Sequence, residues 1–150
     1  AFNYGVSSYE TNPDGDMAVQ QFNLTYSSPV RKQNWFFTFL FGSDSADKAS
    51  NKFNEKSYQG FTYYNSSFLG QRGNRYYMIN VLSTEYGAIN TGLYNKLRKD
   101  TVITAGIGWR YSFNSQFSVR NDYSATTSDS TLEASTYNRF KAEFGLTYSF

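Results

Sequence analysis

The sequence predicts an all-β protein, an eight-stranded antiparallel up-and-down transmembrane β-barrel. Apolar and polar residues alternate along most of the chain, as they do when successive side chains of a strand point to opposite faces. Aromatic residues make up 20% of the chain and charged residues only 17%, fewer than the roughly 25% usual in soluble proteins. The longest apolar run, 35–41, is too short for a membrane helix of ~20 residues but suits a tilted membrane strand.

The last segment, 140–150, shows the alternation most clearly. Every second residue is apolar or aromatic, and the residues between them are polar or small. In a membrane barrel the apolar face meets lipid and the polar face fills the lumen. The chain is long enough for one domain, 1–150, and this segment is expected to be its final strand.

Alternation and turn residues place the first four strands at about 2–10, 17–27, 34–41 and 57–68. We expect Pro29 to end the second strand, because proline has no N–H to donate to a neighbouring strand. Segment 42–56 is polar and without periodicity, so it is predicted to be a loop.

The other four strands are expected at about 75–84, 101–112, 117–124 and 136–150. Segment 85–100 is open to several interpretations: a loop, extended strand ends, or a short helical turn around 94–99. A strand at 88–94 would give nine strands, which the even strand number of bacterial barrels disfavours.

The predicted connections alternate in length. The longer ones are 11–16, 42–56, 85–100 and 125–135, and those between them are generally shorter and turn-like. Outer-membrane barrels have short periplasmic turns and longer extracellular loops. We therefore expect a bacterial outer-membrane location, with both termini periplasmic and the long loops extracellular.

Six charged residues of the last three predicted strands fall on the face opposite the aromatic residues. They are Arg110, Arg120, Asp122, Arg139, Lys141 and Glu143. One interpretation is a selectivity constriction for anions or small solutes. The favoured alternative is a network of ion pairs that fills the lumen, because buried charges need partners.

The last third of the chain carries a family resemblance. Gly106-Ile107-Gly108-Trp109-Arg110-Tyr111-Ser112-Phe113-Asn114, then a strand, a polar loop and a terminal Phe, resemble the ending of the small eight-stranded bacterial outer-membrane proteins, the OmpA transmembrane domain and OmpX-like group. The resemblance implies the barrel fold and the location. Members serve as structural anchors, adhesins, host-defence factors and, in some cases, enzymes. It also implies a C-terminal signature read by the barrel-assembly machinery: Phe144, Leu146, Tyr148 and Phe150.

The absence of histidine and cysteine argues against an enzyme. A Ser-His-Asp triad cannot be built, and a zinc site would lack its usual nitrogen and sulfur ligands. We expect no catalytic residues, no metal and no cofactor. The oxygen-rich segment 12–16, with Asp44 and Asp47 in the next predicted loop, suits Ca²⁺, but turn chemistry is the favoured interpretation. A net charge of +2 is too small to indicate nucleic-acid binding.

Basic residues cluster in the third predicted loop, at Lys96, Arg98 and Lys99. If this loop is extracellular, they are candidates for contact with the phosphates of lipopolysaccharide. The alternative is an ordinary solvated loop. The expected partners are thus outer-membrane lipid and lipopolysaccharide, and the barrel-assembly machinery during biogenesis.

Three functions follow in order of preference. The first is a non-enzymatic outer-membrane barrel with a structural, surface-interaction or envelope-assembly role, alone or as the barrel subunit of a larger envelope complex. The second is a narrow pore or leak channel for small solutes. The third is a soluble ligand-binding β-barrel, which the same alternation would also produce.

Overall fold

A computed structural model describes residues 2–10, 17–30, 33–46, 55–88 and 95–149 of the chain. They form eight strands and one short 3₁₀ helix, η2 (Glu133–Ser135). The strands are β1 (Phe2–Glu10), β2 (Met17–Val30), β3 (Gln33–Ala46), β4 (Lys56–Leu69), β5 (Gly73–Tyr86), β6 (Lys99–Ser112), β7 (Phe117–Ser130) and β8 (Tyr137–Tyr148).

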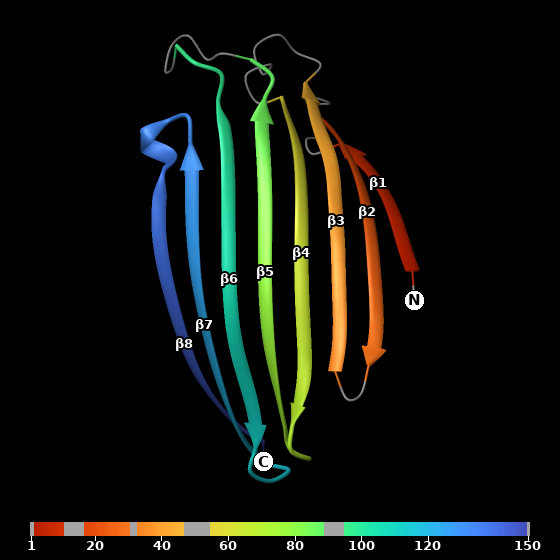
Figure 1. The fold of residues 1–150 in the computed structure, drawn as a ribbon, viewed down its shortest axis with the longest axis vertical. Coiled ribbons are helices and arrows are strands. Elements are labelled where there is room, and N and C mark those ends of the chain that lie inside the picture. Colours follow the sequence, from red (N-terminus) through yellow and green to blue (C-terminus); the bar gives the residue numbers. More distant parts are fainter. Residues whose placement is uncertain (1, 11–16, 31–32, 47–54, 89–94, 150) are drawn as a thin grey trace.

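The strands build one antiparallel sheet in which each strand pairs with the next along the chain (Figure 1). This order confirms the predicted all-β, antiparallel up-and-down arrangement. β1 and β8 are the two edges, and the described residues contain no pairing between them. The sheet is therefore open, and closure into a barrel stays a prediction.

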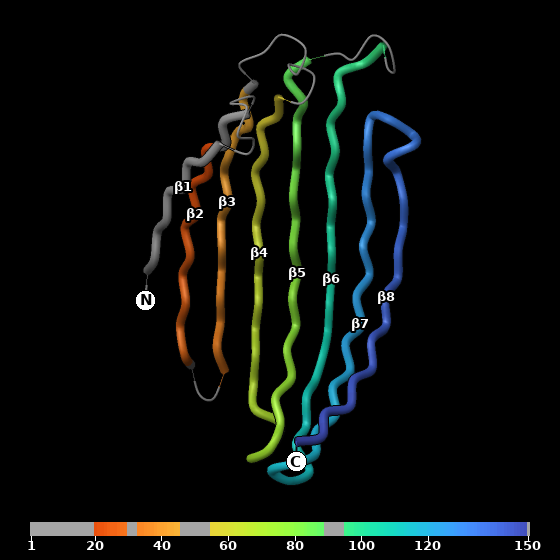
Figure 2. Tube along the Cα trace, turned by 180° about the vertical axis from the view of Figure 1, so that it is seen from behind, coloured from red at the N-terminus to blue at the C-terminus, as the bar shows by residue number. Residues whose placement is uncertain are grey.

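The sheet is curved into a trough, with β1 and β8 receding behind the central strands (Figure 1). The end of β8 points toward the end of the sheet where β2 joins β3 and β6 joins β7, as the view from behind shows (Figure 2), and the start of β1 points the same way in Figure 1. We call this the turn end and the opposite end the loop end. Both ends of the chain therefore leave the sheet in the same direction.

The convex face of the trough is apolar. Its character is clearest in one row of residues paired across β2–β8: Tyr26, Phe37, Tyr63, Ile79, Ala105, Ala125 and Phe140. Aromatic rings contact each other along this face, as between Phe37 and Tyr63, whose centroids are 5.3 Å apart, and between Phe39 and Phe61, at 5.2 Å. Such pairs contribute about 0.5–1.5 kcal/mol each beyond their area burial.

The concave face is polar and more crowded. Asp122, Thr126 and Ser128 of β7 lie on it and are all less than 9% exposed. Glycines lie on it as well, including Gly42, Gly60, Gly106 and Gly108. A Cβ added at Gly108 would overlap the side chains of Tyr76 and Asp122. Side chains converge on the inside of a curve, so glycine makes room for its neighbours.

Several strands are longer than the sequence predicted. Segment 42–46, predicted as loop, continues β3, and segment 125–130, also predicted as loop, continues β7. Pro29 does not end β2, since it pairs with Asn34 and the strand continues to Val30. Pro29 lies next to the β2–β3 connection, where a missing N–H interrupts few inter-strand bonds.

Where it is described, segment 85–100 consists of strand ends at 85–86 and 99–100 and of irregular residues at 87–88 and 95–98. Glu85 and Tyr86 finish β5, and Lys99 begins β6. Residues 95–98 are irregular, so the alternative of a helical turn at 94–99 is wrong for that part. Most of the alternative ninth strand, 89–94, lies outside the described residues. No helix in the described ranges is long and apolar enough to cross a membrane.

Candidate functional site on the concave face

The strand register places all six predicted charged residues on the concave face. Arg110 of β6 is directly opposite Arg120 of β7, and Asp122 of β7 is opposite Glu143 of β8. Lys141 and Arg139 follow on β8, opposite Ser124 and Thr126. The three strands thus gather four cations and two carboxylates on one polar surface.

Asp122 is the centre of this surface. Its side chain is 10% exposed and accepts a hydrogen bond from the Tyr76 hydroxyl, with 2.5 Å between Oη and Oδ1. Its other oxygen, Oδ2, accepts a hydrogen bond from Nε of Arg120. Both carboxylate oxygens are therefore satisfied, which a carboxylate shielded from water requires.

Tyr76 reaches Asp122 by crossing the intervening strand. Tyr76 belongs to β5 and Asp122 to β7, and Gly108 of β6 lies between them in the register. The Tyr76 ring stacks on Tyr64 with centroids 5.5 Å apart, and Tyr64 in turn contacts Phe36 at 5.8 Å. An aromatic series from β3 to β5 thus leads to the buried carboxylate.

The other four charged residues divide into one ion pair and two unpaired cations. Lys141 and Glu143 form an exposed ion pair on β8, with 2.9 Å between Nζ and Oε1. Within the described part of the chain, Arg110 and Arg139 have neither a hydrogen bond nor an ion pair through their side chains. The favoured network of ion pairs is therefore incomplete among the described residues.

A row of hydroxyl and amide groups crosses the same face closer to the loop end. The Thr25 and Thr38 hydroxyls are 3.2 Å apart, and those of Thr104 and Thr126 are 3.0 Å apart. Between these pairs, the Asn80 amide donates to the Thr62 hydroxyl at 2.7 Å. Such a row satisfies polar groups by pairs of side chains and leaves Arg139 at its end on β8.

At the loop end, two of the three residues predicted to contact lipopolysaccharide bind carboxylates of this chain. Nη2 of Arg98 is 2.6 Å from Oδ2 of Asp100, and Lys99 Nζ is 2.8 Å from Oε1 of Glu85. Lys96 is exposed. Contact of Arg98 and Lys99 with lipopolysaccharide would compete with these ion pairs, and that contact stays a prediction.

The predicted C-terminal signature residues lie on the convex face of β8. Phe144 is 66% exposed, and Leu146 and Tyr148 are at least 60% exposed. Phe150 lies outside the described residues. These three side chains therefore form an exposed apolar stripe on an edge strand.

The calcium interpretation gains no support from the described residues. Asp44 forms an ion pair with Lys56, at 3.0 Å, which uses one of its oxygens. Segment 12–16 and Asp47 lie outside the described residues. In the part of the chain that the structure describes, no three acidic side chains lie close enough together to hold a metal ion.

The sequence did not point to Tyr64 or Tyr76 as parts of the polar surface. One signal was available: Gly106 and Gly108 occupy alternate positions of a strand, and glycines with this spacing mark a face that another side chain approaches closely. Which residue approaches depends on the pairing of β5 with β6, which periodicity alone does not specify.

The arrangement can bind and position polar groups. Both oxygens of Asp122 accept hydrogen bonds, from Tyr76 and from Arg120, so this carboxylate holds its two neighbours in position. Among the described residues of this surface, Arg110 and Arg139 are cations whose side chains have no partner.

Comparison with known proteins gives no relative for this chain: no family model, no curated protein and no solved structure matches it.

Proposed function

We propose that this chain is a non-enzymatic, integral outer-membrane β-barrel in which β8 pairs with β1. Its role is structural or interactive: it holds the loop end at the cell surface, alone or as the barrel subunit of an envelope assembly. The resemblance of residues 106–114 and of the C-terminal segment to the OmpA and OmpX-like group supports this proposal.

The observation that carries the proposal is the sorting of exposed apolar side chains onto the convex face. Ile79, Ile103 and Ile107 are 42–45% exposed there, and Phe140 is 70% exposed. Large contiguous apolar surfaces are rare on soluble monomers. In hydrocarbon, exposed apolar side chains carry no free-energy penalty. Backbone N–H and C=O groups cannot stay unpaired there, so a sheet that spans a membrane closes on itself.

The position of the apolar belt along successive strands also supports closure. The row that starts at Tyr4 of β1 passes through Leu24, Phe39, Phe61, Val81, Ile103 and Thr127 and ends at Asn138 of β8. Asn138 lies on the loop side of the apolar part of β8. The belt therefore moves toward the turn end from strand to strand, as in tilted strands of a barrel.

This drift gives an expected register for closure. If β8 is displaced by eight residues along its axis when it pairs with β1, the residue opposite Tyr4 is Leu146 instead of Asn138 (138 + 8 = 146). The same stagger brings Phe2, the first residue of β1, opposite Tyr148, the last residue of β8. An even stagger keeps the apolar positions on one face, whereas an odd one would reverse them.

Paired cysteines test this register directly, because the natural chain has none. In protein inserted in phospholipid bilayers, mild oxidation of the variant Tyr4→Cys/Leu146→Cys should yield an intramolecular disulfide. It would be seen as altered gel mobility that a reducing agent reverses.

The matched control is Tyr4→Cys/Asn138→Cys, the pair expected without a stagger. It should stay reduced under the same conditions. Closure within one chain is disproved if no intramolecular disulfide forms in Tyr4→Cys/Leu146→Cys or in the variants for staggers of six or ten residues, which pair Tyr4 with Phe144 or Tyr148.

A narrow pore is the second candidate, and the unpaired Arg110 and Arg139 on the concave face favour it. A lumen with excess positive charge would select anions. Planar-bilayer recordings separate the two: steady openings with anion selectivity support the pore, and silent insertion supports the structural role.

A soluble ligand-binding barrel fits the arrangement poorly. Such a barrel packs apolar side chains inside and polar ones outside. Here the buried side chains of β7 are polar, and the apolar side chains of β8, Phe140, Phe144, Leu146 and Tyr148, are at least 60% exposed. Folded membrane barrels resist mild detergent until boiled, so a gel shift on heating supports the membrane proposal.

A further inference from the structure

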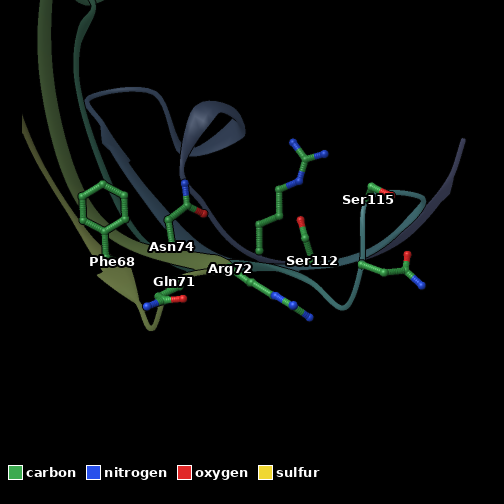
Figure 3. Close-up of a pocket in the computed structure, with 9 residues that line it drawn as sticks. Phe68, Gln71, Arg72, Asn74, Ser112 and Ser115 are labelled. Carbon is green, nitrogen blue, oxygen red and sulfur yellow. The ribbon is translucent and has the colours of Figure 1, made fainter.

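The turn end of the concave face contains an open cavity of about 600 Å³. Its lining is basic and polar, and includes Arg110 of β6, Asn74 of β5 and Ser112 at the end of β6. Figure 3 shows Asn74 and Ser112 on the same side of the ribbon, whereas Arg72 projects to the other side. Polar groups from two neighbouring strands therefore border one space.

The guanidinium of Arg72 is already used in the structure. Its Nη1 donates to the carbonyl oxygen of Phe113 at 2.7 Å and so links the β4–β5 turn to the β6–β7 turn. Arg110 differs, because no carboxylate or carbonyl of the described residues binds its side chain. Arg110 is thus a cation of this cavity that has no anionic partner among the described residues.

The strand register makes an anion at this point favourable. Arg110 is directly opposite Arg120, and like charges at opposed positions destabilise a sheet. Asp122 neutralises Arg120 through Nε, which leaves the two Nη groups of Arg120 available. The neighbouring position on β8 is Gly145, where an added Cβ would come no closer than 3.9 Å to Arg120. No side chain fills the space beside the arginine pair at that position.

We propose that the turn end of the concave face binds a phosphate group between Arg110 and Arg120. The Arg110 guanidinium, the Asn74 amide and the Ser112 hydroxyl line the cavity, and Arg120 lies outside its lining at the paired position on β7. Together these groups offer more donors than the two oxygens of a carboxylate accept, and a phosphate matches them better. The cavity volume leaves room for an organic group attached to the phosphate. This proposal needs only the concave face, so it holds whether or not the sheet closes.

Titration calorimetry of the full chain tests the site with two probes, inorganic phosphate and a short-chain phosphatidic acid. An uncharged maltoside detergent keeps other phosphate headgroups away. Saturable binding of inorganic phosphate is expected, and it should weaken about tenfold or more in Arg110→Gln, the loss of one charge-assisted contact. Tighter binding of phosphatidic acid than of inorganic phosphate assigns the site to a lipid headgroup, and equal binding assigns it to a free phosphate.

Arg139→Gln is the matched control. It removes a cation from the same face that likewise has no described partner, but near the loop end. Its phosphate affinity should stay within about twofold of that of the natural protein, because salt screens the loss of a positive charge that lies far from the site. Equal weakening in both variants, or no saturable binding of either probe to the natural protein, overturns the proposal. Unchanged strand content in the circular dichroism of Arg110→Gln shows that the lost affinity is not lost folding.

Discussion

At the residue scale, small side chains decide what the concave face can hold. Gly108 lets Tyr76 reach across β6 to the carboxylate of Asp122. Without that space, the hydroxyl of Tyr76 could not satisfy Oδ1, and a buried carboxylate oxygen without a partner is costly. The glycine, the tyrosine and the aspartate therefore act as one unit, although they lie on three different strands.

This dependence predicts the effect of a single methyl group. Gly108→Ala should lower the free energy of unfolding by about 1–3 kcal/mol, because the new Cβ overlaps both the Tyr76 ring and Asp122. Equilibrium unfolding with denaturant, in the detergent or bilayer that keeps the protein folded, measures the loss.

Gly145→Ala is the control for that substitution. Gly145 lies on the same face, but an added Cβ there meets no atom closer than 3.9 Å. A change within about 0.5 kcal/mol is expected for it. Equal losses in the two alanine variants would show that glycine acts through the backbone rather than through crowding.

At the element scale, the strands extend beyond the part that hydrophobic alternation identifies. Residues 42–46 and 125–130 are largely polar on both faces, so they have no apolar period, yet they continue the pairing of β3 and β7. Backbone hydrogen bonds hold these extensions, and a sequence pattern based on side chains cannot see them. We expect them to project past the apolar belt at the loop end.

Asp100 ties one of these extensions together, on the loop side of the belt. Burial raises the pKa of Asp100, but hydrogen bonds from Arg98 and Ser130 and the Arg98 charge outweigh it, and the net pKa is below its ordinary 3.8. The ionised carboxylate therefore stabilises the folded state. That contribution is complete above the ordinary pKa and is lost as the pH falls through the lower, folded-state pKa.

The corresponding prediction concerns Asp100→Asn. At neutral pH the variant should unfold at a lower temperature than the natural protein, because it loses the charge-assisted bonds from Arg98 and Ser130. The difference should narrow as the pH falls below about 4 and should vanish once Asp100 of the natural protein is protonated. Thermal unfolding followed from pH 7 to pH 2 measures both, and a constant difference across that range would exclude this role of the carboxylate.

At the scale of the whole molecule, the curvature of the sheet separates two environments. The convex face exposes aromatic and aliphatic side chains, and the concave face carries mainly hydroxyl groups, amides and charges, with the rings of Phe36, Tyr64 and Tyr76 among them. This is the reverse of a water-soluble barrel. The proposed membrane location therefore depends on whether lipid or water covers the convex face.

A substitution at Ile79 tests whether lipid or water covers the convex face. It lies near the middle of β5 on the convex face and is 45% exposed. If lipid covers this face, Ile79→Arg should cost about 2–4 kcal/mol in a bilayer. If water covers it, the same exposed substitution should cost no more than about 0.5 kcal/mol.

Ile79→Ala controls for lost packing against neighbouring strands, and its cost is subtracted from that of the arginine variant. Reversible unfolding from phospholipid vesicles provides the comparison. An arginine cost no larger than the alanine cost would place the convex face outside hydrocarbon.

The sequence by itself determined the order of the strands and the two faces of most of them, because side-chain alternation is a local property with a period of two. It placed all six charged residues opposite the aromatic ones for the same reason. Only the tertiary structure decided which of those charges meet. The reach of Tyr76 over Gly108, the opposition of Arg110 and Arg120, and the full strand lengths all depend on the register between strands. Register is a relation between distant segments, so no single segment carries it.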